Sequence, residues 1–229
     1  HIIAGHLGPT LELMLTSTLL AMMIGAWIGI IGAVKRYSLF DSVATIGTMI
    51  ALSIPTFWFG LMAIVVFSIY LQWLPAGGFE DITVAHTGLA RTLDIASHLV
   101  LPTLTLALFY MAIYLRIMRG SMLEVLTLDF VRTARAKGMD ETRVVVRHVL
   151  RNALTLIGLQ AGTMLGGSVV VESVFSLPGL GRLAYESVIQ RDLNTLLGIV
   201  FVSALLVITV NFIVDLLYAR LDPRITTGS

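Results

Sequence analysis

The chain has 229 residues, of which 57% are hydrophobic and 13% are charged. Soluble domains carry about 25% charged residues, so this chain has too few polar side chains to cover a water-soluble globule. Its net charge of +1 gives no bulk attraction to nucleic acid, and its lack of cysteine excludes disulfides and thiolate metal sites. The composition therefore predicts a membrane protein.

Five apolar runs are long enough to cross a bilayer as helices, which takes about 20 residues each. They occupy residues 11–34, 43–74, 98–117, 153–175 and 196–219. The second run is longer than a bilayer requires and contains Pro55, so we expect a tilt, kink or break there. In the third run Pro102 is expected in the first helical turn, where proline is tolerated.

The charges between these runs predict the orientation. Segment 116–151 carries eight basic and four acidic residues, whereas the segments between the second and third runs and between the fourth and fifth are acidic overall. Cytoplasmic loops are enriched in lysine and arginine, so 116–151 is expected in the cytoplasm, with the N-terminus outside and the C-terminus inside. Five helices that begin outside predict that a further helix precedes them.

Glycines spaced four residues apart occur in the first and fourth runs. Gly25 and Gly29 form one pair, and Gly158, Gly162 and Gly166 form two overlapping pairs. Small residues at this spacing let membrane helices approach closely. Ordinary enrichment of glycine in membrane helices explains the same pattern, so both interpretations stay open.

Segment 116–151 is too polar to cross the membrane and is rich in helix-forming residues. Gly138 divides part of it into two predicted helices, 129–137 and 140–151, because glycine suits the left-handed residue that ends a helix. Arg143, Arg147 and Arg151 then share one face of the second helix. Such a basic face binds either lipid phosphates or a soluble partner, and the physical pattern favours neither.

The order of several characteristic stretches carries more information than any one of them. Residues 129–138 are Asp-Phe-Val-Arg-Thr-Ala-Arg-Ala-Lys-Gly, and residues 147–154 are Arg-His-Val-Leu-Arg-Asn-Ala-Leu. Further stretches lie at 7–13, 52–58, 73–78, 101–107, 158–160, 170–175, 177–182, 214–218 and 221–224. Together they resemble ABC-importer permeases of the dipeptide, oligopeptide and nickel family, and the first two are similar to the cytoplasmic EAA loop of that family.

The resemblance implies an all-α, polytopic transmembrane helical bundle with the type I ABC-importer permease fold, with five spans visible and one N-terminal span missing. It implies one permease domain over 1–229, with an EAA-type cytoplasmic coupling loop at 119–152. About one helical turn is missing after Leu154 relative to the family. The loop would contact an ATPase subunit through Arg132, Thr133, Ala134, Arg135, Ala136, Lys137, Gly138 and Arg143.

The resemblance also implies partners, cofactors and location. The expected partners are a second homologous permease, two ABC ATPase subunits, an extracytoplasmic substrate-binding protein and the lipid bilayer, without nucleic acid. The chain itself would bind no cofactor, because ATP and Mg would be used by the ATPase subunits. It would sit in the inner or plasma membrane of a bacterium or archaeon and form half of a pathway for peptides or peptide-like solutes.

A second candidate site lies on the expected external side. Glu172 lies near the outer end of the fourth run, and Pro178 and Gly179 lie in the turn that follows it. All three are candidates for an external gate or a contact with the binding protein. Charged residues in membrane segments are costly and often functional. The competing interpretation of Glu172 is an interfacial carboxylate in water. Asp215, near the end of the fifth run, is expected to pair with a basic group.

Enzyme motifs are missing from the sequence, which has no Walker A loop, no H-E-x-x-H and no G-x-S-x-G. Energy for transport would therefore come from another polypeptide. Two alternatives remain at this stage. A secondary transporter would need ionisable residues deep in its helices, and a membrane scaffold outside the ABC class would use the basic loop as a lipid or partner patch.

Overall fold

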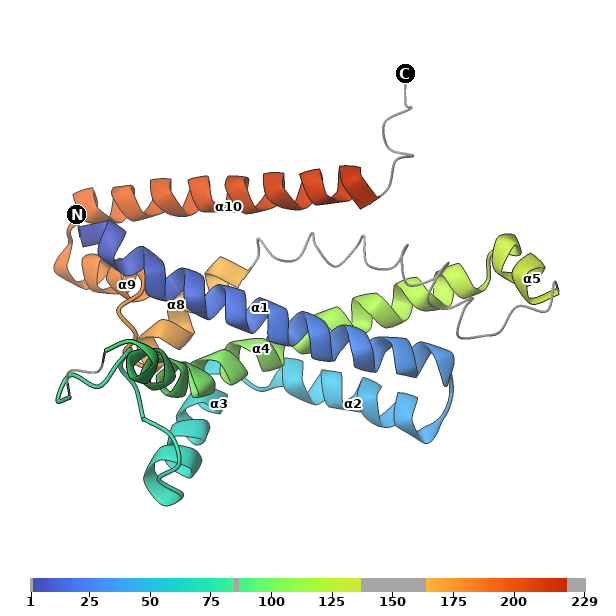
Figure 1. Ribbon diagram of the computed structural model, residues 1–229, viewed down its shortest axis with the longest axis horizontal. Helices are drawn as coiled ribbons and strands as arrows, with labels where there is room; N and C mark the ends of the chain where they lie inside the picture. Colours follow the sequence, from blue (N-terminus) through green and yellow to red (C-terminus); the bar gives the residue numbers. More distant parts are fainter. Residues whose placement is uncertain (1, 85–86, 137–163, 222–229) are drawn as a thin grey trace. The chain divides into compact units, whose positions relative to one another are not determined.

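The computed structural model describes residues 2–84, 87–136 and 164–221, and every regular element within these residues is helical. The all-α fold class is thereby confirmed. In chain order (Figure 1) the elements are α1 (Ile2–Val34), α2 (Leu39–Ser53), α3 (Thr56–Ala63), the π-helix η1 (Ile64–Tyr70), α4 (Leu89–Leu126), α5 (Asp129–Ala136), α8 (Met164–Val174), α9 (Leu180–Gln190) and α10 (Leu193–Leu221).

Three of the described helices are long and apolar enough to cross a membrane, namely α1, α4 and the part of α10 up to Ile213. α2 meets the same test only together with α3 and η1, because Ile54 and Pro55 interrupt the helix. This interruption confirms the break predicted at Pro55. It arises because proline offers no N–H for a helical hydrogen bond and disfavours helical backbone in the residue before it. The predicted run 153–175 is described only from residue 164 onward.

The apolar runs predict the positions of the helices more accurately than they predict where each helix begins. α4 begins at Leu89 rather than at residue 98, so Pro102 lies inside the helix. The prediction that Pro102 occupies the first turn was wrong, because the start of α4 contains Arg91 and Asp94 and is helical without being apolar. α1 likewise begins at Ile2 instead of residue 11.

α10 begins directly after Asp192 because that side chain caps it. The Asp192 carboxylate accepts hydrogen bonds from the Thr195 N–H at 3.1 Å and from the Thr195 hydroxyl at 2.5 Å. These bonds stabilise the ionised form and lower the pKa of Asp192 below its usual range. An aspartate in this position satisfies N–H groups that have no partner within the helix.

The chain forms two compact units. Unit 1 contains residues 1–20, 52–109 and 163–205, and unit 2 contains residues 21–51, 110–162 and 206–229. α1, α4 and α10 each contribute one end to unit 1 and the other end to unit 2. Glu172 therefore belongs to unit 1, and the expected coupling loop belongs to unit 2.

Unit 1 packs around Phe175, the residue directly after α8. A methyl group placed on Gly60 of α3 would lie 3.2 Å from side-chain atoms of both Phe175 and Val174, so α3 and the end of α8 are in close contact. The Phe175 carbonyl accepts the Gly78 N–H at 2.9 Å. These contacts fix the end of α8 and thereby position the turn that follows it.

Unit 2 packs around a stripe of glycines on α1. A methyl group on Gly25 would lie 2.7 Å from the Met111 carbonyl oxygen on α4, and one on Gly29 would lie 2.8 Å from the Leu115 carbonyl oxygen. The interpretation of this pair as a close helix–helix contact is confirmed. Gly158 and Gly162 lie outside the described residues, so a similar contact by the second glycine run stays a prediction.

Replacement of Gly25 or Gly29 with alanine should destabilise unit 2. Alanine is the better helix former, but its methyl group would push α1 away from the α4 backbone, and overpacking of this kind costs about 1–3 kcal/mol. Gly47→Ala is the matched control, because a methyl group at Gly47 meets no other atom within 4 Å. Thermal unfolding in detergent should occur at a lower temperature for the first two variants only. An equal midpoint for all three variants would contradict the close contact.

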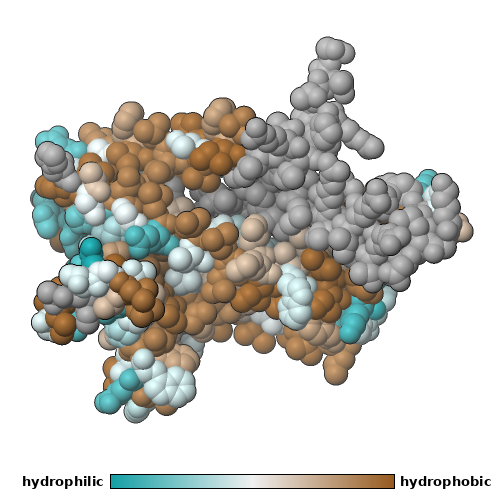
Figure 2. Space-filling view, in the orientation of Figure 1, coloured by the Kyte–Doolittle hydropathy of each residue, from teal (hydrophilic) through white to brown (hydrophobic). Residues whose placement is uncertain are grey.

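α10 is the least buried of the three long apolar helices α1, α4 and α10. Only 6% of the most apolar 18-residue stretch of α10 is buried, compared with 67% of the corresponding stretch of α4. Figure 2 shows apolar surface over much of the visible described residues. The large exposed side chains of α10 include Leu197, Val200, Phe201, Leu205, Ile208 and Phe212. Because lipid tails are as apolar as leucine, such a face is suited to contact lipid or another membrane subunit.

Candidate functional site

The Glu172 carboxylate is the centre of a hydrogen-bond cluster in unit 1. The Thr10 hydroxyl donates to Oε1 at 2.8 Å, and the backbone N–H groups of Gly181 and Arg182 donate to Oε2 at 2.7 and 3.1 Å. The two N–H groups belong to the first turn of α9, where backbone donors lack helical partners and negative charge is favoured. Glu172 is 0% exposed. Its interpretation as an interfacial carboxylate in water is therefore wrong.

Thr10 joins α1 to this cluster. Its hydroxyl donates to Glu172 and also accepts the Leu180 N–H at 2.7 Å. One side chain on α1 thus holds both the end of α8 and the start of α9. Sequence reasoning missed Thr10, because its partners lie 162 and 170 residues away and no local pattern signals the contact.

Two glycines make room for the carboxylate. A methyl group on Gly179 would overlap the Glu172 carboxylate, and one on Gly181 would lie 2.5 Å from the Cα atom of Val169 on α8. Between α8 and α9 the chain exposes Pro178 while Gly179 is buried. The predicted set of Glu172, Pro178 and Gly179 is therefore brought together, with one exposed member and two buried ones.

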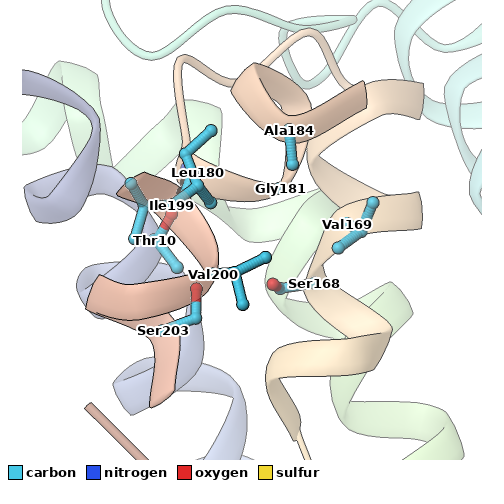
Figure 3. A pocket seen from close by; sticks show the side chains of 9 residues that line it. All are labelled: Thr10, Ser168, Val169, Leu180, Gly181, Ala184, Ile199, Val200 and Ser203. Atoms are coloured by element: carbon cyan, nitrogen blue, oxygen red, sulfur yellow. Dashed lines mark hydrogen bonds between the residues drawn. The ribbon is translucent and has the colours of Figure 1, made fainter. Parts of the chain in front are cut away.

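A hollow of about 290 Å³ adjoins the cluster within unit 1. Figure 3 shows the side chains of Thr10, Ser168 and Ser203 reaching it from three helices. Among the described residues, the remaining lining is apolar or glycine and carries no charge.

In unit 2, α5 follows α4 after only two residues, Thr127 and Leu128. Hydrogen bonds from their N–H groups to carbonyls near the end of α4, both at 3.1 Å, hold this turn. Val131 of α5 is fully buried, whereas Thr133 and Ala136, three positions apart on one face, are exposed. Among the described side chains of α5, Asp129 is also exposed on that face, so the face combines one carboxylate with two small residues and is suited to contact with a partner.

Comparison with known proteins decides what kind of chain carries these features. The family model of the binding-protein-dependent transport system inner membrane component matches residues 21–227. The chain belongs to this permease family. It is a membrane-spanning permease subunit of an ABC importer and a multi-pass protein of the inner membrane. The scaffold and secondary-transporter alternatives are set aside.

Relatives of this permease are similar over almost its whole length. It is 45% identical to the oligopeptide transport system permease protein AppB of Bacillus subtilis (strain 168), over 98% of this chain and 71% of the relative. It is 41% identical to the di/tripeptide transport system permease protein DppB of Pseudomonas aeruginosa (strain UCBPP-PA14), over 94% of this chain and 70% of the relative. The dipeptide transport system permease protein DppB of Escherichia coli (strain K12) is 38% identical over the same shares.

Solved structures support the fold of the permease. One chain from the inward-facing MetNI methionine ABC transporter has a TM-score of 0.74 at 18% sequence identity, covering 96% of both chains. A chain of an amino acid ABC transporter crystallised with histidines has a TM-score of 0.70 at 18% identity, covering 96% of this chain and 94% of that one. These similarities show the fold alone.

The expected coupling residues of the permease are only partly described. The first predicted helix of the loop, 129–137, is confirmed as α5 up to Ala136. The second, 140–151, lies outside the described residues. So do Lys137, Gly138 and Arg143, and the side chains of Arg132, Ala134, Arg135 and Asp215.

Proposed function

We propose that the permease forms half of a membrane pathway for peptides or peptide-like solutes. The observation that carries this proposal is the similarity at 38–45% identity, over nearly the whole chain, to permeases named for oligopeptide, di/tripeptide and dipeptide transport. The other half would be a second, homologous permease. An extracytoplasmic binding protein would deliver the solute, and two ABC ATPase subunits would hydrolyse ATP with Mg on the cytoplasmic side.

The coupling element in this proposal is the loop at 119–152, whose first described helix after α4 is α5. The small exposed residues Thr133 and Ala136 would let α5 seat closely in an ATPase groove. Basic neighbours in the sequence, Arg132, Arg135 and Lys137, would add polar contacts, and Gly138 would end the helix. The excess of basic residues in this loop supports a cytoplasmic position for it and for the C-terminus.

On the external side, we assign different tasks to the three residues of the turn. Pro178 is exposed and is the member of the set that a binding protein would touch. Glu172 is buried and would support the turn from inside by holding the first N–H groups of α9. Gly179 would be required because any side chain there would displace that carboxylate.

Transport by the reconstituted complex tests this function. The permease would be placed in liposomes with its partner permease and ATPase subunits, with a peptide-loaded binding protein outside and ATP inside. Uptake of labelled peptide should require both ATP and the binding protein, and a Walker-lysine variant of the ATPase should abolish it. Uptake driven by an ion gradient without ATP would contradict the proposal.

A further inference from the structure

An ion pair joins α2 to α4 within unit 2. The Arg119 guanidinium donates from Nε to Oδ1 of Asp41 at 2.5 Å and from Nη2 to Oδ2 at 2.8 Å. The Asp41 side chain is 4% exposed and the Arg119 side chain is 26% exposed. Two parallel hydrogen bonds fix the relative orientation of the two groups as well as their distance. The pair therefore sets how the start of α2 lies against α4.

Asp41 also holds the turn between α1 and α2. Its Oδ2 accepts the N–H of Tyr37 at 3.1 Å, and Tyr37 has a left-handed backbone with φ of 63°. The Asp41 N–H in turn donates to the Ser38 hydroxyl at 3.2 Å. Left-handed backbone in a residue with a side chain persists only when its surroundings impose it. One carboxylate thus stabilises the turn and attaches it to α4.

The ion pair continues the glycine contact between α1 and α4. Gly32 lies next to the pair, and a methyl group there would be 3.3 Å from Oδ1 of Asp41 and 3.8 Å from Cδ of Arg119. Together with Gly25 and Gly29 it forms one stripe on α1, at positions i, i+4 and i+7. This half of α1 is therefore held to α4 by close packing, and the ion pair between α2 and α4 lies beside its end.

The α4 segment that carries Arg119 leads directly to α5. From Arg119 to Leu126 the helix continues for about 10 Å, at 1.5 Å per residue. The hydrogen-bonded turn at Thr127 and Leu128 follows, and the Val131 N–H of α5 donates back to the Leu128 carbonyl at 3.0 Å. A displacement of α5 therefore acts on α4 close to the ion pair.

We propose that Asp41 and Arg119 are positioning residues that make the α1–α2 turn move as one piece with α4 and α5. A displacement of α5 would then be transmitted to α1 and α2, and the end of α4 would not bend in response to it. The inference rests on the proposed role of α5 as the ATPase contact. Neither residue touches the solute in this proposal, and their contribution is to the transfer of motion.

The test is the amount of peptide taken up per ATP hydrolysed by the reconstituted complex. Arg119→Gln and Asp41→Asn should each lower this ratio about tenfold. A factor of this size corresponds to the interaction energy typical of two residues in direct contact. The double variant should be no worse than either single variant, because the same contact is lost in all three. Arg116→Gln is the matched control, since Arg116 lies on the same helix and is exposed; its ratio should equal that of the wild type.

A wild-type ratio in Arg119→Gln, or losses that multiply in the double variant, would overturn the proposal. If Arg119→Gln fails to assemble, Arg119→Lys replaces it, because lysine keeps the charge but cannot make the paired Nε and Nη2 bonds. Its ratio should also fall, and a wild-type ratio would again overturn the proposal. Uptake by the wild-type complex tests the proposed function, whereas the comparison of ratios between variants tests the role of the ion pair. Failure of one proposal can therefore be told from failure of the other.

Discussion

Glu172→Gln should destabilise the protein by about 1–3 kcal/mol, the usual effect of removing one partner from buried hydrogen bonds. The carboxylate accepts bonds from the Thr10 hydroxyl and from the N–H groups of Gly181 and Arg182. A glutamine amide has one acceptor oxygen and would direct its NH₂ group at another donor. The thermal unfolding midpoint of the detergent-solubilised complex should fall accordingly, and the turn after α8 should become easier to cleave with protease.

A second pair of variants checks that the cluster is responsible. Thr10→Val keeps the shape of the side chain but removes the hydroxyl that serves Glu172 and Leu180, so it should lower the midpoint as Glu172→Gln does. Thr92→Val is the control, because Thr92 is exposed near the start of α4 and its hydroxyl donates to the nearby Gly88 carbonyl rather than to another helix, so this variant should leave the midpoint unchanged. If Glu172→Gln reduced transport without changing the midpoint, the residue would act as a gate in contact with solute or partner, not as an internal support.

Ala136→Trp should reduce peptide uptake about thirtyfold or more, because a bulky residue in a closely packed contact removes at least 2 kcal/mol of binding. Ala136 is exposed at the end of α5, so the substitution should leave folding intact. Co-purification should show less ATPase bound to the permease. The measurements are uptake and the amount of ATPase recovered.

The control for added bulk is Leu39→Trp, also in unit 2, at a side chain that is 81% exposed. Uptake and ATPase recovery should match the wild type in this control. Equal uptake in Ala136→Trp and Leu39→Trp would mean that the exposed face of α5 makes no contact that transport requires.

Local sequence patterns predicted the features that depend on local chemistry. Pro55 ends α2 because a proline cannot continue the hydrogen-bond ladder, and Gly25 and Gly29 mark a close contact because only glycine permits it. The start of α4 was misplaced because hydropathy reports where a helix is apolar, and polar residues such as Arg91 are helical there as well. The π-helix η1 had no signal in the apolar run that contains it.

Partners distant in the sequence could not be predicted in the same way. Asp41 and Arg119 are 78 residues apart, and Thr10 and Glu172 are 162 apart. A charge beside an apolar run requires a partner, so Glu172 stood out as a residue of interest. Which group satisfies it depends on how the helices pack. The identity of the partner also changed the interpretation of Glu172, from a surface carboxylate to a buried support.

Cross-linking from α5 tests the central claim most directly, because the chain has no cysteine and Ala136→Cys would supply its only thiol. A photoreactive group attached to that thiol in the assembled complex should form a covalent product with an ATPase subunit. The same group on Leu39→Cys should give much less of that product. Adducts from position 136 that contain lipid or the external binding protein, with no ATPase, would contradict the assignment of α5 as the coupling element.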